Sequence, residues 1–168
     1  VQTQMLLLVG ALYRGAIVWN KGAAAGASTA WGTYGSPANP VLRGTYEMIY
    51  VVSKEQLNKE SSGAEADITG NEFMKATLDV WDDIGTVSNE QTGHPAAFPV
   101  RLAQRLIQLY SWPGDVVLDP FFGSGQTGLA ADALGRGWIG IDISKEYCDL
   151  AARRIAPFEG MEVPVERV

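Results

Sequence analysis

The stretch of sequence that dictates the fold is DVVLDPFFGSGQTGLAADALGRGWIGIDIS, residues 115–144. A short apolar strand at residues 115–119 is followed by a glycine-rich turn and a helix, and a second apolar strand covers residues 138–143. Ser144 is a suitable N-cap for a further helix that runs through Arg154. Such a β-α-β-α unit builds a parallel sheet with right-handed crossovers. We therefore expect an α/β fold with a mostly parallel sheet and helices on both of its faces.

The turn between the first strand and its helix carries Gly123, Gly125 and Gly128, which match the pattern G-x-G-x-x-G. Glycines in this place let the backbone approach a ligand closely, and the first turn of the helix offers N–H groups without helical partners. Asp142 stands at the end of the next strand, where a carboxylate can accept hydrogen bonds from both ribose hydroxyls of an adenosine-containing cofactor. The alternative is that the glycines serve only helix–strand packing and that Asp142 merely ends a strand.

The choice of cofactor depends on what surrounds this turn. Too few residues follow Gly128 for the further βαβ repeats of a six-stranded dinucleotide fold. Asp119 ends the first strand, where its carboxylate would repel a pyrophosphate but suits a cationic ligand that bears an amino acid. These two observations favour S-adenosylmethionine. A fragment of a pyrophosphate-binding oxidoreductase is the less favoured alternative.

Three segments of this part of the chain resemble one family. Asp119-Pro-Phe-Phe-Gly-Ser-Gly125 looks like the cofactor motif of DNA methyltransferases that modify adenine N6 or cytosine N4. It is similar in particular to the permuted class, in which the catalytic half precedes the cofactor half. Residues 94–99 resemble the segment that walls the methionine end of the cofactor in that class. Residues 135–142, followed by Tyr147, are similar to its acidic-strand motif and the helix after it.

The resemblance implies a Rossmann-like fold of S-adenosylmethionine-dependent methyltransferases, with DNA as the partner of the whole protein. It implies no metal site, and it leaves the choice between adenine and cytosine open. The residues that it places at the cofactor are His94, Phe98, Pro99, Asp119, Pro120, Phe121, Phe122, Gly123, Ser124, Gly125, Thr127, Asp142 and Ile143.

The motif that carries catalysis in this family does not occur in the 168 residues. It consists of Asp, Asn or Ser followed by two prolines and an aromatic residue, which together hold the amine and the face of a flipped base. The nearest string, Ser36-Pro37-Ala38-Asn39, lacks the second proline and the aromatic residue, so it is interpreted as a loop. The catalytic strand is expected upstream of Val1, and no residue is assigned a catalytic role. The alternative is a non-catalytic module that binds S-adenosylmethionine.

The amino-terminal part is similar to the late strands of the family's catalytic half. Residues 4–13 are expected to end a helix. Residues 16–19 and 46–52 are rich in β-branched and aromatic side chains and are expected to pair as an antiparallel hairpin at the edge of the sheet. Their connection, residues 22–42, contains no charged residue and is dominated by Gly, Ala, Ser, Thr and Pro, which predicts a flexible loop.

Negative charge is concentrated in one segment. Residues 55–90 carry nine acidic and two basic side chains, against a net charge of −6 for the whole chain, so the rest is close to neutral. This segment is expected to be a solvated insert or a helical face, with one short extended piece near residues 79–84. Residues 99–110 then place apolar side chains on one helical face, with Pro99 at the first helical position. A single domain, incomplete at its amino terminus, is expected over residues 1–168. Its parts are residues 1–54 with the late catalytic-half strands and their loop, an acidic variable segment at 55–92 and the cofactor-binding half at 93–168.

Composition excludes several classes of protein. Apolar residues make up 46% of the chain and charged residues 19%, which is ordinary for a globular domain and unlike a disordered or collagen-like chain. The single cysteine, Cys148, cannot form an internal disulfide, and one histidine leaves no Cys/His zinc cluster. The apolar run at residues 5–9 is too short to span a bilayer and carries no secretory-signal flanks. A cytoplasmic protein without a membrane partner is expected.

Overall fold

The computed structural model describes residues 10–22, 31–61, 63–93 and 95–156. The chain divides into two compact units, which are described separately below. The first combines Val1–Glu60 with Thr77–Thr86, and the second combines Ser61–Ala76 with Val87–Val168. The predicted three-part division of the chain stays a prediction. Within the described ranges, no helix is both long and apolar enough to cross a membrane.

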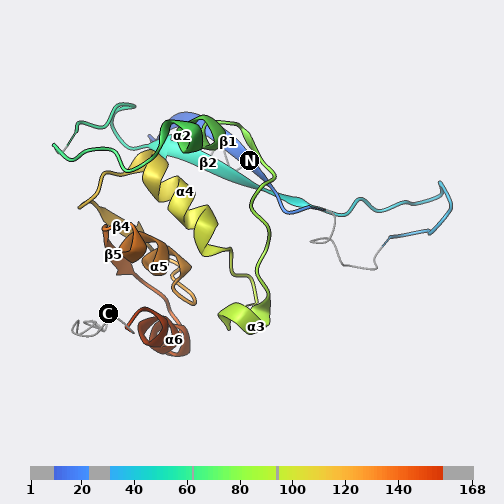
Figure 1. Ribbon diagram of the computed structural model, residues 1–168. Helices are drawn as coiled ribbons and strands as arrows, with labels where there is room; N and C mark the ends of the chain where they lie inside the picture. Colours follow the sequence, from blue (N-terminus) through green and yellow to red (C-terminus); the bar gives the residue numbers. More distant parts are fainter. Residues whose placement is uncertain (1–9, 23–30, 62, 94, 157–168) are drawn as a thin grey trace. The chain divides into compact units, whose positions relative to one another are not determined.

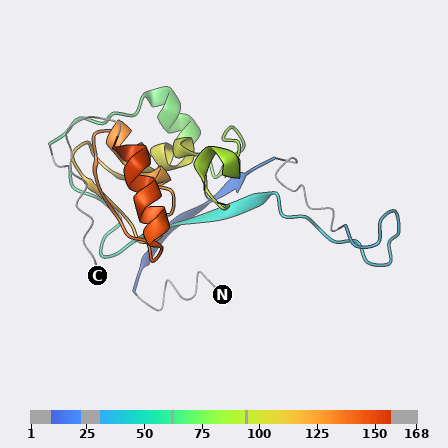
Figure 2. The ribbon, with the colours of Figure 1, turned by 90° about the horizontal axis from the view of Figure 1, so that it is seen from below.

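The first unit is built on a three-stranded sheet in the order β2-β1-β3. β1 (Leu12–Asn20) and β2 (Tyr46–Ser53) are antiparallel neighbours, as Figures 1 and 2 show. β3 (Val80–Trp81) runs parallel to β1 on its other side. The predicted hairpin and the predicted short extended piece are therefore both confirmed.

The core of the first unit is formed by large apolar side chains of β1 and of the segment around β3. Successive side chains of a strand point to opposite faces, and the alternate residues Ile17 and Trp19 of β1 are buried. Trp81 and Ile84 are buried as well. The indole N–H of Trp19 donates to the backbone oxygen of Ile84 at 2.8 Å, which satisfies its polar atom inside this core.

The predicted helix over residues 4–13 is wrong at its end. Leu12 and Tyr13 belong to β1, where they pair with the last residues of β2. Residues 4–9 lie outside the described residues. A short apolar run does not by itself distinguish a helix from a strand, and pairing with β2 decides the conformation here.

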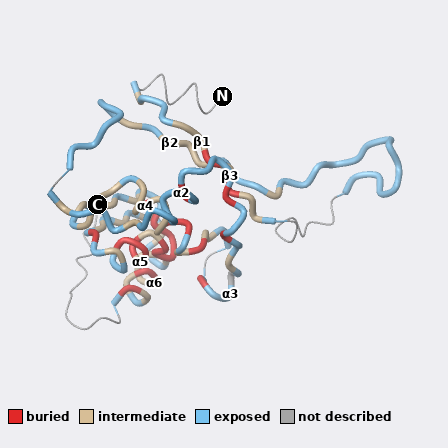
Figure 3. The backbone as a smooth tube through the Cα atoms, turned by 45° about the horizontal axis from the view of Figure 1, so that its top comes forward, coloured by how far each residue is buried: buried red, intermediate tan, exposed pale blue. Residues whose placement is uncertain are grey.

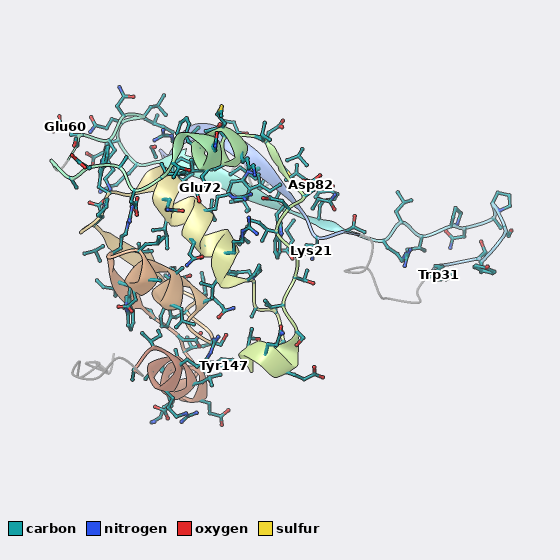
Figure 4. All side chains as sticks on the ribbon, in the orientation of Figure 1. Lys21, Trp31, Glu60, Glu72, Asp82 and Tyr147 are labelled. Atoms are coloured by element: carbon teal, nitrogen blue, oxygen red, sulfur yellow. The ribbon has the colours of Figure 1, made fainter. Side chains whose placement is uncertain are left out.

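The connection between β1 and β2 contains a turn closed by a side chain. Residues 23–30 lie outside the described residues, so the flexibility of the loop stays a prediction. Beyond them, Asn39 donates its backbone N–H to Oγ1 of Thr33 at 2.8 Å. Trp31, labelled in Figure 4, lies on the same loop and is 42% exposed. The string Ser36-Pro37-Ala38-Asn39 lies in this exposed turn, as its interpretation as a loop requires.

The second unit contains the predicted β-α-β-α arrangement. β4 (Val116–Asp119) and β5 (Gly137–Gly140) pair in parallel, and α5 (Gln126–Ala133) connects them. α6 (Lys145–Ile155) follows β5. The side chain of Ser144 caps α6 by accepting a backbone N–H of its first turn at 3.4 Å. The order and type of these elements are as predicted.

The second unit also holds α2 (Gly70–Ala76), α3 (Asn89–Thr92) and α4 (Val100–Tyr110). The sequence patterns predicted α4 but neither α2 nor α3. The prediction that Pro99 is the first residue of α4 is wrong by one position. Pro99 is the N-cap, with an extended backbone at φ −70° and ψ 145°, because a cap residue lies half outside the helix.

Helices cover one face of the β4–β5 pair. Val117 and Trp138 pack against residues of α4 and α5. Their strand neighbours Val116, Leu118 and Ile139 point to the opposite face and are between 53% and 63% exposed. Figure 3 shows that buried residues gather along α5. The buried residues of α4 are Leu102, Ala103 and Ile107.

A buried ion pair joins part of the acidic segment to the rest of the second unit. The Arg136 guanidinium makes a two-pronged contact with the Asp67 carboxylate, in which Nη2 donates to Oδ1 at 2.9 Å. Arg136 also donates to the backbone oxygens of Ser111 at 2.8 Å and of Leu134 at 2.7 Å. Its side chain has no exposed surface, whereas that of Asp67 keeps 29%.

Gly140, at the end of β5, lies directly against the ring of Phe122. A Cβ at position 140 would collide with this ring, whereas a Cβ on Gly137, in the same strand, would make an ordinary contact at 3.4 Å with Val116. Gly140→Ala is therefore expected to lower the free energy of unfolding by about 2 kcal/mol through overpacking. Gly137→Ala, the matched control, should change it by less than about 0.5 kcal/mol. Urea unfolding measures both, and equal effects would contradict the clash.

Candidate cofactor-binding site

The glycine turn and the acidic residue after β5 meet through hydrogen bonds. The Asp142 carboxylate accepts the backbone N–H of Gly123 at Oδ2 and that of Ser144 at Oδ1, both at 2.8 Å. These bonds turn the chain toward α6, so β5 ends at Gly140 and not, as predicted, at Ile143. Since β4 and β5 are parallel neighbours, their carboxyl ends bring both motifs to one edge of the sheet.

Asp119 organises the start of the same turn. Its Oδ1 accepts the backbone N–H of Phe121 at 2.9 Å, and its Oδ2 accepts the hydroxyl of Thr127 at 2.6 Å. The carboxylate thereby links the end of β4 to the first turn of α5. An ionised carboxylate has about four acceptor positions, so both Asp119 and Asp142 keep capacity for further donors.

Ser124 and Gly125 form the tightest part of the turn. Ser124 is 3% exposed, and its Oγ has no hydrogen-bond partner among the described residues. Gly125 is the N-cap of α5 with φ +82°, a left-handed conformation that favours glycine. A Cβ at position 125 would lie 2.9 Å from Cβ of Ala151 in α6. The space beside Gly125 is therefore occupied by α6, which supports the packing role for this glycine.

The segment before α4 lies next to the turn. The backbone oxygen of Phe98 accepts from Nε2 of Gln126, the first residue of α5, at 2.7 Å. Pro99 is buried, and its backbone oxygen accepts the N–H of Leu102 at 2.9 Å. His94 lies outside the described residues. The structure thus brings Phe98 and Pro99 to the glycine turn, and the role of His94 stays a prediction.

The aromatic residues of the motif have opposite environments. Phe122 is 7% exposed and stacks on Trp138, with 5.2 Å between ring centroids, so its role is in the core. Phe121 is 87% exposed and Pro120 is exposed too. Ile143, which follows Asp142, is fully exposed. Large apolar side chains left exposed beside polar acceptors are typical of a surface that a ligand covers.

Two residues at this site were missed in the sequence. Gln126 is buried, and its side-chain oxygen accepts from Nη2 of Arg154 at 2.8 Å. In the sequence, a basic residue in the last turn of a helix is already expected from the helix dipole, so Arg154 gave no sign of a contact with the glycine turn. A polar residue directly after the glycines was the one available signal.

These features are those of an S-adenosylmethionine-dependent methyltransferase fold. The chain belongs to the DNA methylase family of N6 and N4 methylases, whose family model matches residues 2–153. The orphan methyltransferase M.BamHII of Bacillus amyloliquefaciens is 52% identical over 62 residues, and the DNA adenine methyltransferase YhdJ of Escherichia coli K12 is 44% identical over 84 residues. These matches cover 37% and 49% of this chain.

A solved structure agrees with the family. TTHA0409 of Thermus thermophilus aligns with a TM-score of 0.71 at 29% identity, over 95% of this chain and 60% of that one. This confirms the expected fold class. The chain spans about a quarter of the length of the curated relatives that it matches, 23% of M.BamHII and 29% of YhdJ.

Proposed function

We propose that this chain carries the cofactor-binding half of a DNA amino-methyltransferase that transfers the methyl group of S-adenosylmethionine to adenine N6 or cytosine N4. The observation that carries the proposal is the hydrogen-bonded junction between the glycine turn and Asp142 at the carboxyl ends of two parallel strands. Family membership supports it, and so does a crystal structure of TTHA0409 complexed with S-adenosyl-L-methionine. DNA as the partner of the whole protein rests on the names of the relatives.

The residues present fit this cofactor. Asp142 would accept the ribose hydroxyls with the lone pairs that Gly123 and Ser144 leave free. The buried Oγ of Ser124, which lacks a partner in the described part of the chain, offers a further polar contact inside the turn. Phe121 would offer an apolar surface for the adenine ring. The bound cofactor supplies an electrophilic methyl group on a sulfonium sulfur.

The remaining site residues have supporting roles in the proposal. Asp119 would place negative charge near the cationic end of the ligand while it holds the turn through Thr127. The segment at Phe98 and Pro99 would wall the methionine end, together with His94. Gly125 and Phe122 would keep the turn packed against the core, whereas Pro120 and Ile143 would border the ligand at the two strand ends.

We also propose that the protein belongs to the permuted class and that the catalytic segment lies outside these 168 residues. The order of the segments supports the class, because the residues similar to late catalytic-half strands precede the glycine turn. The absence of a Pro-Pro-aromatic motif supports the proposed place of the catalytic segment. The same absence favours the second candidate, a non-catalytic module that binds S-adenosylmethionine. Residues 1–54 would then be late strands of the catalytic half and residues 93–168 the cofactor half. The cytoplasmic location stays a prediction.

Titration calorimetry tests the cofactor. The chain is expected to bind S-adenosylmethionine and S-adenosylhomocysteine, and Asp142→Ala should weaken both by at least about tenfold because charge-assisted hydrogen bonds are lost. Asp132→Ala, which removes an exposed carboxylate of α5, is the matched control and should leave the affinity unchanged. A folded wild-type chain that binds neither ligand, or equal affinities for wild type and Asp142→Ala, would overturn the proposed site.

A further inference from the structure

Arg154 connects α6 to the glycine turn. Its Nη1 donates to the backbone oxygen of Ser124, and its Nη2 donates to Oε1 of Gln126 at 2.8 Å. Gln126 in turn donates from Nε2 to the backbone oxygen of Phe98 at 2.7 Å. One continuous series of hydrogen bonds therefore links the end of α6, the turn and the segment before α4.

The orientation of the Gln126 amide is set by its neighbours. Gln126 is 5% exposed, so its polar atoms need partners inside the protein. The oxygen faces the guanidinium of Arg154, which can only donate, and the nitrogen faces the carbonyl of Phe98, which can only accept. A flipped amide would meet a donor with a donor and an acceptor with an acceptor. The Gln126 amide therefore bridges Arg154 and the 98–99 segment, so the position of one constrains the position of the other.

The guanidinium of Arg154 stays in this place although burying its charge is unfavourable. Its acceptors on Ser124 and Gln126 are neutral oxygens, and burial lowers the pKa of Arg154 because it disfavours the charged form. The helix α6 also packs closely against Gly125 in the turn. Ala151 and Ile155, on the same face of α6, would lie 2.9 and 3.1 Å from a Cβ at Gly125. The position of α6 and that of the turn are thus mutually fixed.

We infer that Arg154 is a positioning residue that sets the methionine end of the cofactor site. Acting through Gln126, it holds the Phe98–Pro99 segment at a fixed place relative to the turn around Ser124. The inference rests on the proposed function, because that function places the methionine moiety against this segment. The Asp142 carboxylate is not a member of the series, because its own bonds go to the backbone N–H groups of Gly123 and Ser144, so the proposed ribose contact has separate support.

Hydrogen exchange of backbone amides tests the connection without any ligand. Arg154→Met removes both links, so exchange should rise at least about tenfold at residues 96–98 and in the turn at 124–127. Gln126→Glu keeps an acceptor for Arg154 but loses the donor to Phe98, so exchange should rise only at residues 96–98. Arg153→Met, on the exposed side of α6, is the control and should change neither. The same pattern in all three variants would overturn the connection.

Ligand discrimination tests the positioning role. 5′-Methylthioadenosine shares the adenosine and thioether of S-adenosylhomocysteine but lacks the amino acid. Arg154→Met and Gln126→Glu should weaken S-adenosylhomocysteine at least about tenfold and 5′-methylthioadenosine less than about threefold, measured by calorimetry. Equal losses for both ligands, or none, would overturn the inference.

Failure of the proposed function has a different signature. If the wild-type chain binds neither ligand, the cofactor assignment is wrong, and the ligand-positioning role of Arg154 is then wrong as well. The exchange pattern still decides whether Arg154 holds the two segments together.

Discussion

No methyl transfer to DNA is expected from the 168-residue chain assayed alone, even at saturating cofactor. A methyltransferase must also extract the base and hold its amine in line with the sulfonium methyl group. Alignment of this kind supplies about 7–11 kcal/mol of the barrier, and the chain lacks the Pro-Pro-aromatic motif that does this in the family. The activity is measured as the transfer of labelled methyl groups to mixed-sequence duplex and single-stranded DNA at high protein concentration.

Asp142→Ala controls for contaminating methyltransferases in that assay. Transfer by the wild-type chain that disappears in the variant would contradict the prediction. The loop Ser36-Pro37-Ala38-Asn39 would then have to be reconsidered as a catalytic segment. Absence of transfer does not by itself separate the two candidate functions. Activity restored by adding an upstream segment with the missing motif would identify an enzyme and exclude a non-catalytic module.

Asp67→Ala is expected to lower the free energy of unfolding by about 3 kcal/mol, because it leaves a fully buried guanidinium without its carboxylate. Arg136 has no exposed side-chain surface, so the loss of Asp67 leaves a buried charge without its counter-ion, while its bonds to the backbone oxygens of Ser111 and Leu134 remain. Asp149→Ala is the matched control, because it breaks an ion pair with Lys145 whose side chains are 42% and 77% exposed. It should cause no resolvable change. Urea unfolding at neutral pH measures both, and similar effects would contradict the burial argument.

The same ion pair predicts a pH dependence. The hydrogen bond from Arg136 lowers the pKa of Asp67 below its ordinary value. A carboxyl group with a lowered pKa in the folded state stabilises the fold above its unfolded pKa of about 3.9 and loses this contribution as the pH falls through its folded pKa. The stability difference between wild type and Asp67→Asn should therefore be constant from neutral pH down to about 5 and shrink below about 4. A difference independent of pH would contradict the pairing.

The parts of the fold that could be predicted are those whose boundaries are marked by residues close in sequence. The β-α-β-α unit was predicted because each boundary has its own residue: glycines between β4 and α5, and a capping serine before α6. The hairpin was predicted because β1 and β2 are rich in β-branched and aromatic residues. α2 was missed although it carries a local signal, the reciprocal hydrogen bonds between Thr69 and Glu72 at its start. The acidic character of the segment concealed that capping pattern.

The parts of the fold and of the site that could not be predicted depend on residues distant in sequence. Arg136 and Asp67 are separated by 69 positions, and Arg154 and Gln126 by 28. Periodicity and spacing describe neighbours along one element, so they carry no information about such partners. The role of Gly125 was undecided for the same reason, since only the fold reveals that Ala151 fills the space beside it.

The two backbone bonds of Asp142 also bear on how fast a ligand can bind. Gly123 and Ser144 are held by a carboxylate of this chain, so the bonds that order this stretch of backbone need no ligand atom. The entropy of fixing a loop is then not subtracted from the affinity. Association at this edge of the sheet should accordingly be limited by diffusion and orientation and not by a slow rearrangement of the turn.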